Sequence, residues 1–260
     1  MSLSRSRLAV LTTVAVLALL AVPTGGAAPA AQPQITVYAA ASLTDVFPAI
    51  APHEKYSFGG SNTLATQIQQ GAPADVFASA NMKIPLQLFS QNLCSKPVVF
   101  TRNTLVVVVP KSNPGHIHNV YDLTKSGVSI DIAQSGVPVG SYTLQILKNM
   151  NLSAAVLKNV VSQETDVREV LSKVALGEVD AGFVYSTDAK TVPGKVKVIK
   201  VPAWAQPKVQ YGICVVSASS EKPAAQAFIK LVLSKAGQKK LHKYGFLARV
   251  KKQTHKKKKK

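Results

Sequence analysis

Hydroxyl groups and glycines recur in this chain where an apolar run that predicts a strand gives way to a segment that predicts a helix. They occur at Ser42, at Ser61, and within the segments 139–141 and 165–167. The first N–H groups of a helix have no partner inside the helix and carry a partial positive charge. Several helix starts that meet in one cleft can therefore hold an anion without a lysine or an arginine. Tyr185, at the end of a predicted strand, would add a phenol as a further donor.

Ordinary helix capping is the simpler explanation for any single junction of this kind. A serine at a helix start commonly caps the helix and stabilises it by about 1 kcal/mol. The prediction of a site therefore depends on all four junctions together, and from the residues alone it extends only to an anion-binding cleft. In open α/β sheets such a cleft lies at the carboxyl ends of the strands.

The elements that must position these junctions alternate between strand and helix, which predicts an α/β fold with parallel strands. A first group has helix starts at Ser42 and Ser61 and predicted strands at 34–40, 55–58, 75–78 and 105–109. A second group has predicted strands at 128–133 and 181–185 and predicted helices at 141–150 and 167–176. A strand at 211–216 and a helix at 223–233 return to the first group, so the chain crosses twice and a hinge is expected.

The amino terminus predicts export. Arg5 and Arg7 precede an uncharged apolar run, 8–22, which is followed by proline, glycine and alanine, as in a secretory signal peptide. The run is shorter than the ~20 residues that span a bilayer. No cysteine follows it, so a lipid anchor is not expected, and we expect a periplasmic or extracellular protein. The expected organisation is a signal peptide at 1–31, lobe 1 at 32–110, lobe 2 at 111–207, a return strand with the rest of lobe 1 at 208–250, and a disordered polybasic tail at 251–260.

The net charge of +19 raises the question of a nucleic-acid partner. Much of this charge lies at the two ends, in Arg5 and Arg7 and in the lysine-rich segment 249–260. No aromatic-studded basic face of the kind that single-strand binders use accompanies it, so no nucleic acid is expected. Adhesion of the basic tail to anionic lipid stays open as an alternative.

Motifs for catalysis or for a metal cation are absent from the sequence. It contains no H-E-x-x-H, no G-x-S-x-G and no phosphate-cradling G-x-x-x-x-G-K-[ST] motif, so we expect neither an enzyme nor a cofactor. His116 and His118 are predicted to be surface residues of a loop. Cys94 and Cys214 could form a disulfide in an exported protein or be buried free thiols, and their spacing does not decide between the two.

Several stretches resemble, in order and spacing, the periplasmic molybdate-binding proteins of ABC transporters. The most specific are AAASLT at 39–44, FGGSNTLA at 58–65 and GAPADVFASA at 71–80. Further matches are NTLVVVVP at 103–110, VPVG at 137–140, ETDVR at 164–168, GFVYSTDA at 182–189 and YGF at 244–246. Together they cover nearly all of residues 34–248.

This resemblance implies a type II periplasmic-binding-protein fold, with two α/β lobes joined by a two-strand hinge. It implies that hydroxyls and backbone amides bind an oxyanion, molybdate or tungstate, with no countercharge and no direct metal cation site. The family's binding positions fall on Ser42, Ser61, Val139, Val167 and Tyr185. The implied partner is an ABC permease in the cytoplasmic membrane, and we expect a monomer. Another tetrahedral oxyanion such as sulfate is the alternative ligand.

The chain departs from the family pattern in two places. The segment between Ser42 and Ser61 is shorter than usual, and Pro48 lies inside the expected first helix. Because proline is tolerated only in the first turn, we expect a short helix that starts at Ser42. The lysine tail has no counterpart in the family pattern.

Overall fold

The computed structural model describes residues 33–249 of the chain. The predicted signal peptide and the predicted lysine tail lie outside the described residues. Within them, no helix is long and apolar enough to cross a membrane.

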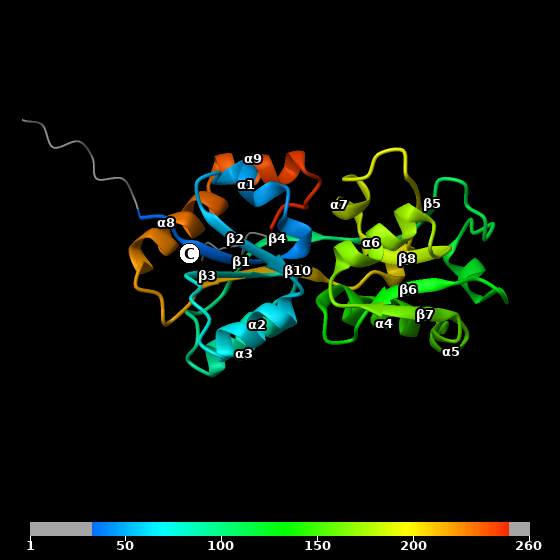
Figure 1. The fold of residues 1–260 in the computed structure, drawn as a ribbon, viewed down its shortest axis with the longest axis horizontal. Helices are drawn as coiled ribbons and strands as arrows, with labels where there is room; N and C mark the ends of the chain where they lie inside the picture. Colours follow the sequence, from blue (N-terminus) through cyan, green and yellow to red (C-terminus); the bar gives the residue numbers. More distant parts are fainter. Residues whose placement is uncertain (1–32, 250–260) are drawn as a thin grey trace, which may run out of the picture. The chain divides into compact units, whose positions relative to one another are not determined.

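The described chain builds two five-stranded sheets, each flanked by helices (Figure 1). The first sheet has the order β2-β1-β3-β10-β4 and contains β1 (Thr36–Ala40), β2 (Lys55–Gly59), β3 (Val76–Ser79), β4 (Val98–Asn103) and β10 (Val209–Val215). The second has the order β7-β6-β8-β5-β9 and contains β5 (Leu105–Pro110), β6 (Ile130–Ala133), β7 (Val160–Glu164), β8 (Ala181–Tyr185) and β9 (Val196–Lys200). Each sheet is the centre of one lobe, which confirms the predicted two-lobed α/β architecture.

Both sheets are mixed, although the alternation of elements predicted parallel strands. β1 runs parallel to β2 and β3, and β6 runs parallel to β7 and β8. β10 and β5 run antiparallel to their neighbours. Each of these two strands enters its sheet at the carboxyl end of a neighbour, since Leu105 pairs with Tyr185 and Gly212 pairs with Ser79. A strand that starts at the carboxyl end of its neighbour must run antiparallel to that neighbour.

The apolar run at 105–109 lies in a different lobe from the one expected. It forms β5 at the interior of the second sheet, between β8 and β9, so the chain leaves the first sheet at Thr104 rather than after Pro110. All six residues of β5 are buried. Because such a β-branched run suits the centre of either sheet, its composition does not indicate which sheet contains it.

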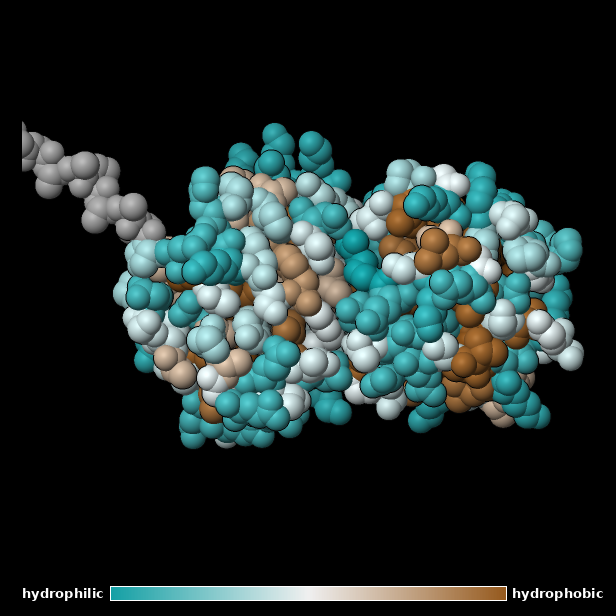
Figure 2. Space-filling view, viewed as in Figure 1, coloured by the Kyte–Doolittle hydropathy of each residue, from teal (hydrophilic) through white to brown (hydrophobic). Residues whose placement is uncertain are grey.

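Nine α-helices of the described chain pack around the sheets. The first lobe has α1 (Val46–Ile50), α2 (Ser61–Gln69), α3 (Lys83–Ser90), α8 (Lys222–Leu233) and α9 (Lys235–Lys243). The second lobe has α4 (Pro138–Asn149), α5 (Ser153–Leu157), α6 (Val167–Leu176) and α7 (Ser186–Ala189). Three short 3-10 helices lie at Ala41–Leu43, Val120–Thr124 and Ala203–Ala205. Figure 2 shows a largely hydrophilic surface on this face, with hydrophobic residues in small groups.

The start of the first helix differs from the expectation. Ser42 lies in the 3-10 helix Ala41–Leu43, and α1 begins only at Val46, so the predicted helix start at Ser42 is wrong. Pro48 is the third residue of α1, where its missing N–H would have had no partner inside the helix. The helix has five residues and is therefore as short as its proline suggested.

Both cysteines are free and buried. Cys94 and Cys214 are 3% and 1% exposed and lie in one apolar cluster of the first lobe. The structure therefore has two free thiols rather than a disulfide, which were the two alternatives that the sequence left open.

Candidate anion-binding site

The five predicted site residues line a single small cavity between the lobes. Its empty volume is about 200 Å³. The first lobe contributes the two serines and the second lobe contributes the other three residues, so the structure brings together Ser42, Ser61, Val139, Val167 and Tyr185. The rest of the lining is mostly small or apolar and consists of Ala40, Ala41, Gly59, Gly60, Ala80, Val137, Pro138 and Asp166.

Ser61 begins α2 but does not cap it. The predicted helix start is confirmed, but the N-cap residue is Gly60 and no side chain caps the helix, so ordinary capping does not explain this serine. The Ser61 Oγ instead accepts the N–H of Ala80 at 3.1 Å. This bond fixes the oxygen in a residue that is 1% exposed and leaves the hydroxyl proton available to an acceptor in the cavity.

Ser42 is held by a chain of polar groups that the sequence did not reveal. Its Oγ lies 2.9 Å from the phenol oxygen of Tyr211, which also accepts the side-chain amide of Asn103 at 3.4 Å. Burial raises the pKa of Tyr211 well above its usual value, so the phenol stays neutral. If Tyr211 donates to Ser42, the Ser42 proton is free to donate into the cavity.

The start of α4 presents unpaired N–H groups. Pro138 has none, and the N–H of Ser141 donates to the carbonyl of Val137, which leaves those of Val139 and Gly140. A Cβ added to Gly140 would lie 2.1 Å from the Gln134 carbonyl oxygen. Only glycine therefore lets this first turn pack so closely against the end of β6.

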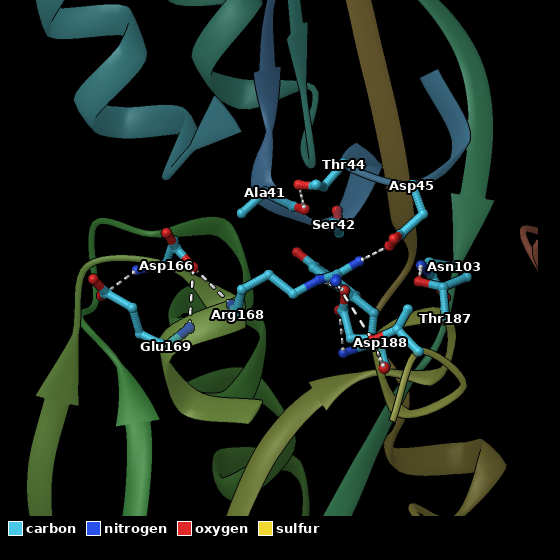
Figure 3. Close-up of polar contacts among 12 residues, drawn as sticks. Ala41, Ser42, Thr44, Asp45, Asn103, Asp166, Arg168, Glu169, Thr187 and Asp188 are labelled. Atoms are coloured by element: carbon cyan, nitrogen blue, oxygen red, sulfur yellow. Dashed lines mark hydrogen bonds and ion pairs between the residues drawn. The ribbon is translucent and has the colours of Figure 1, made fainter. Parts of the chain in front are cut away.

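The start of α6 is capped by its own side chains. The Asp166 carboxylate accepts the N–H groups of Arg168 at 2.6 Å and Glu169 at 3.2 Å, as Figure 3 shows. The Glu169 carboxylate accepts the N–H of Asp166 in return, which completes a capping box. Of the first N–H groups of the helix, the one that remains is that of Val167, which lines the cavity.

Tyr185 supplies the phenol of the cavity. It is 1% exposed, and burial raises its pKa well above the usual value, so it stays a neutral donor. Its hydroxyl has no hydrogen-bond partner among the described residues. The ring packs against Tyr211 with a centroid separation of 5.6 Å.

Charged groups near the cavity are occupied elsewhere. No lysine or arginine of residues 33–249 lines it, and Asp166, the one acid that does, is engaged in capping α6. The Arg168 guanidinium pairs with Asp188 at 2.9 Å and with Asp45 at 2.5 Å (Figure 3). No cluster of three histidine, cysteine or acidic side chains suited to a metal ion occurs in the described part of the chain.

The two lobes touch beside the cavity. A Cβ added to Gly60, in the first lobe, would lie 2.3 Å from the carbonyl oxygen of Thr165, in the second. The backbones therefore approach as closely as glycine allows, and the cavity has the form of a closed cleft.

The fold and the site define a two-lobed solute-binding protein whose cleft presents neutral hydrogen-bond donors. A family model described as bacterial extracellular solute-binding protein matches residues 35–247, and the chain belongs to this family. It is a periplasmic or extracellular protein.

The relatives fall in the same class. The chain is 37% identical to the molybdate-binding protein ModA of Mycobacterium tuberculosis over 222 residues, which cover 82% of this chain and 84% of the relative. It is 34% identical to the molybdate-binding protein ModA of Haemophilus influenzae, covering 85% and 92% of the two chains. The solved structure of the periplasmic molybdate-binding protein of Azotobacter vinelandii matches in fold with a TM-score of 0.73 at 22% identity, covering 84% and 100% of the two chains.

Proposed function

We propose that this protein is the solute-binding subunit of an ABC importer and that it captures molybdate, and also tungstate, between its lobes. The observation that carries the proposal is the unpartnered phenol of Tyr185 in a cavity where four other candidate donors meet. The names of the relatives support molybdate as the ligand. In this proposal the bound anion accepts from Ser42, Ser61, Val139, Val167 and Tyr185.

The site selects a fully ionised tetrahedral dianion. Its candidate groups are hydroxyls and amides that are free to donate, so each oxygen of a dianion finds a partner. A protonated phosphate must also donate, and the backbone N–H groups of the site cannot accept, so a proton that faces them stays unpaired at a cost of about 1–3 kcal/mol. Sulfate has the right charge, so its rejection would depend on its smaller size.

We also propose that the protein catalyses no reaction and hands its ligand to a permease in the cytoplasmic membrane as a monomer. The two site serines contact Tyr211 and the N–H of Ala80, and no histidine of residues 33–249 lines the cavity, so neither serine has a histidine to act as its general base. Transport by such a protein needs only capture and release.

Thermal unfolding with added anions tests the proposal. A ligand at about 1,000 times its dissociation constant adds about 4 kcal/mol of apparent stability. We expect molybdate and tungstate to raise the melting temperature and sulfate and phosphate to leave it unchanged. A shift with sulfate alone would reassign the ligand, and no shift with any of the four anions would refute the proposal.

The two serines provide the first variant. Replacing Ser42 and Ser61 together with alanine removes two donors and leaves their N–H groups, so we expect the molybdate-induced shift to be lost. Ser153→Ala is the matched control, because Ser153 also begins a helix, α5, and lies outside the cavity. An unchanged shift in the double variant would place the site elsewhere.

A further inference from the structure

An ion pair connects the two lobes beside the cavity. Arg168, the second residue of α6 in the second lobe, places its Nη2 2.5 Å from the Asp45 carboxylate, which precedes α1 in the first lobe. Figure 3 shows the arginine extended between the two lobes, with Asp45 on one side and Asp188 on the other. Because the partners belong to different lobes, opening the cleft must separate them.

The second lobe holds this arginine in place before any closure. Its Nε donates to Asp188 at 2.9 Å and its Nη1 to Thr191 at 3.4 Å, both within the second lobe. The other Asp188 oxygen accepts the N–H of Tyr185 at 3.2 Å. Arg168 is therefore tied through one buried carboxylate to the strand end that carries the phenol of the site, and Val167 is its neighbour in sequence.

Asp45 has no comparable role inside its own lobe. Its side chain does not cap α1, and its one ion pair or hydrogen bond within residues 33–249 is the one to Arg168. Its side chain is 43% exposed. Removing its charge should therefore leave the first lobe folded and affect mainly the closed state.

We propose that Asp45 and Arg168 form a closure pair, which stabilises the closed cleft without touching the ligand. The inference rests on the proposed function, because it assumes that capture requires closure. In this arrangement the guanidinium of Arg168 acts between the lobes, while neutral donors act on the anion. The pair thus sets how long any captured oxyanion is retained, and the cavity sets which oxyanion is captured.

The size of the effect follows from the exposure of the pair. Partly exposed ion pairs contribute little, so removal should weaken binding by about threefold. The weakening should be the same for molybdate and tungstate, because the pair contacts neither. It should appear as faster dissociation, since the pair forms only after the lobes meet, and it should shrink at high salt, which screens exposed charges.

The experiment compares Asp45→Asn with the wild-type protein by calorimetric titration of molybdate and tungstate at low and high salt. Dissociation is followed by chasing radiolabelled molybdate with excess tungstate. We expect faster release from Asp45→Asn, an unchanged ratio of the two affinities, and unchanged thermal unfolding of the ligand-free protein. Asp45→Glu, which keeps the carboxylate, should restore most of the wild-type retention.

Lys125→Gln is the matched control. Lys125 forms an ion pair with Asp122 at 2.9 Å with a side chain that is 49% exposed, but both partners belong to the second lobe. Loss of this ion pair should change neither the affinity for molybdate nor the rate of its release. Wild-type release from Asp45→Asn, or failure of Asp45→Glu to restore retention, would overturn the closure pair. Absence of binding to the wild-type protein would instead refute the proposed function itself.

Discussion

At the scale of single residues, Tyr185 gives the most direct support for a ligand in the proposed site. Its phenol is buried and has no partner within the described chain. A buried hydroxyl left unpaired destabilises a protein by about 1–3 kcal/mol. An acceptor that arrives with a ligand would remove this loss, whereas a purely structural role for the hydroxyl would not explain it.

Tyr185→Phe separates the two roles of this side chain. The ring and its packing against Tyr211 remain, while the unpaired hydroxyl is lost. We expect the ligand-free variant to be as stable as the wild-type protein or slightly more stable, and to bind molybdate about tenfold more weakly. Thermal unfolding without ligand and calorimetric titration measure the two quantities. A large loss of stability with unchanged affinity would contradict the assignment of the phenol as a donor.

The sequence did not predict the residues whose role is to hold or pair with another side chain of the protein. Ser42 and Tyr211 are 169 positions apart, and Asp45 and Arg168 are 123 apart. Tyr211 lies inside an apolar run that predicts only a strand, and Asp45 follows a serine and a threonine as if it belonged to a helix start. Contacts between such distant residues follow from the packing of the lobes, which no local pattern encodes.

At the scale of elements, prediction succeeded where local signals agree. α6 begins and ends as expected, at Val167 and Leu176. A capping box forms its start, four of its apolar residues are buried at helical spacing, and Gly177 ends it with a φ of 77°. The lysine-rich segment 195–200, for which the sequence predicted no element, contains β9. β9 is an edge strand, where lysines discourage pairing with other chains, so its composition reflects its position in the sheet.

Gly60 is the element-scale position at which the lobes meet. Its φ and ψ of −60° and 130° suit any residue, so Gly60→Ala should fold normally, but the added Cβ would meet the Thr165 carbonyl oxygen. We expect at least a tenfold loss of molybdate affinity, with little change in the unfolding of the ligand-free protein. Gly59→Ala is the control, because Gly59 also lines the cavity, but its added Cβ would have its nearest contact 3.8 Å away on the Leu64 side chain of the same lobe. Equal affinities for the two variants would show that closure does not need this contact.

At the scale of the whole molecule, one buried acid should make stability depend on pH. Asp131 in β6 is fully buried, and neither carboxyl oxygen has a partner among the described residues. Burial, together with the nearby charge of Glu164, raises its pKa to about 7. The charge of Lys173, which pairs with Glu164 at 2.5 Å, acts against this shift.

The direction of this pH dependence follows from the number of protons that the folded and unfolded states bind. Between pH 4 and 7 the unfolded chain has lost the Asp131 proton while the folded chain retains it, so stability falls as pH rises through this range. Asp131→Asn keeps the shape of the protonated side chain but cannot ionise. We expect it to raise the melting temperature at pH 8, to have little effect at pH 4, and to flatten the profile between them. A variant that is less stable at pH 8 would contradict a protonated Asp131.

The chain passes from the first lobe to the second through a very short connection. A single residue, Thr104, separates β4 from β5, and the residue before it, Asn103, is bonded to the phenol that steadies Ser42. Rotation of the lobes about Thr104 should disturb the hydrogen bonds that orient the Ser42 hydroxyl. Opening should therefore weaken anion binding before the cleft is wide enough for the anion to leave.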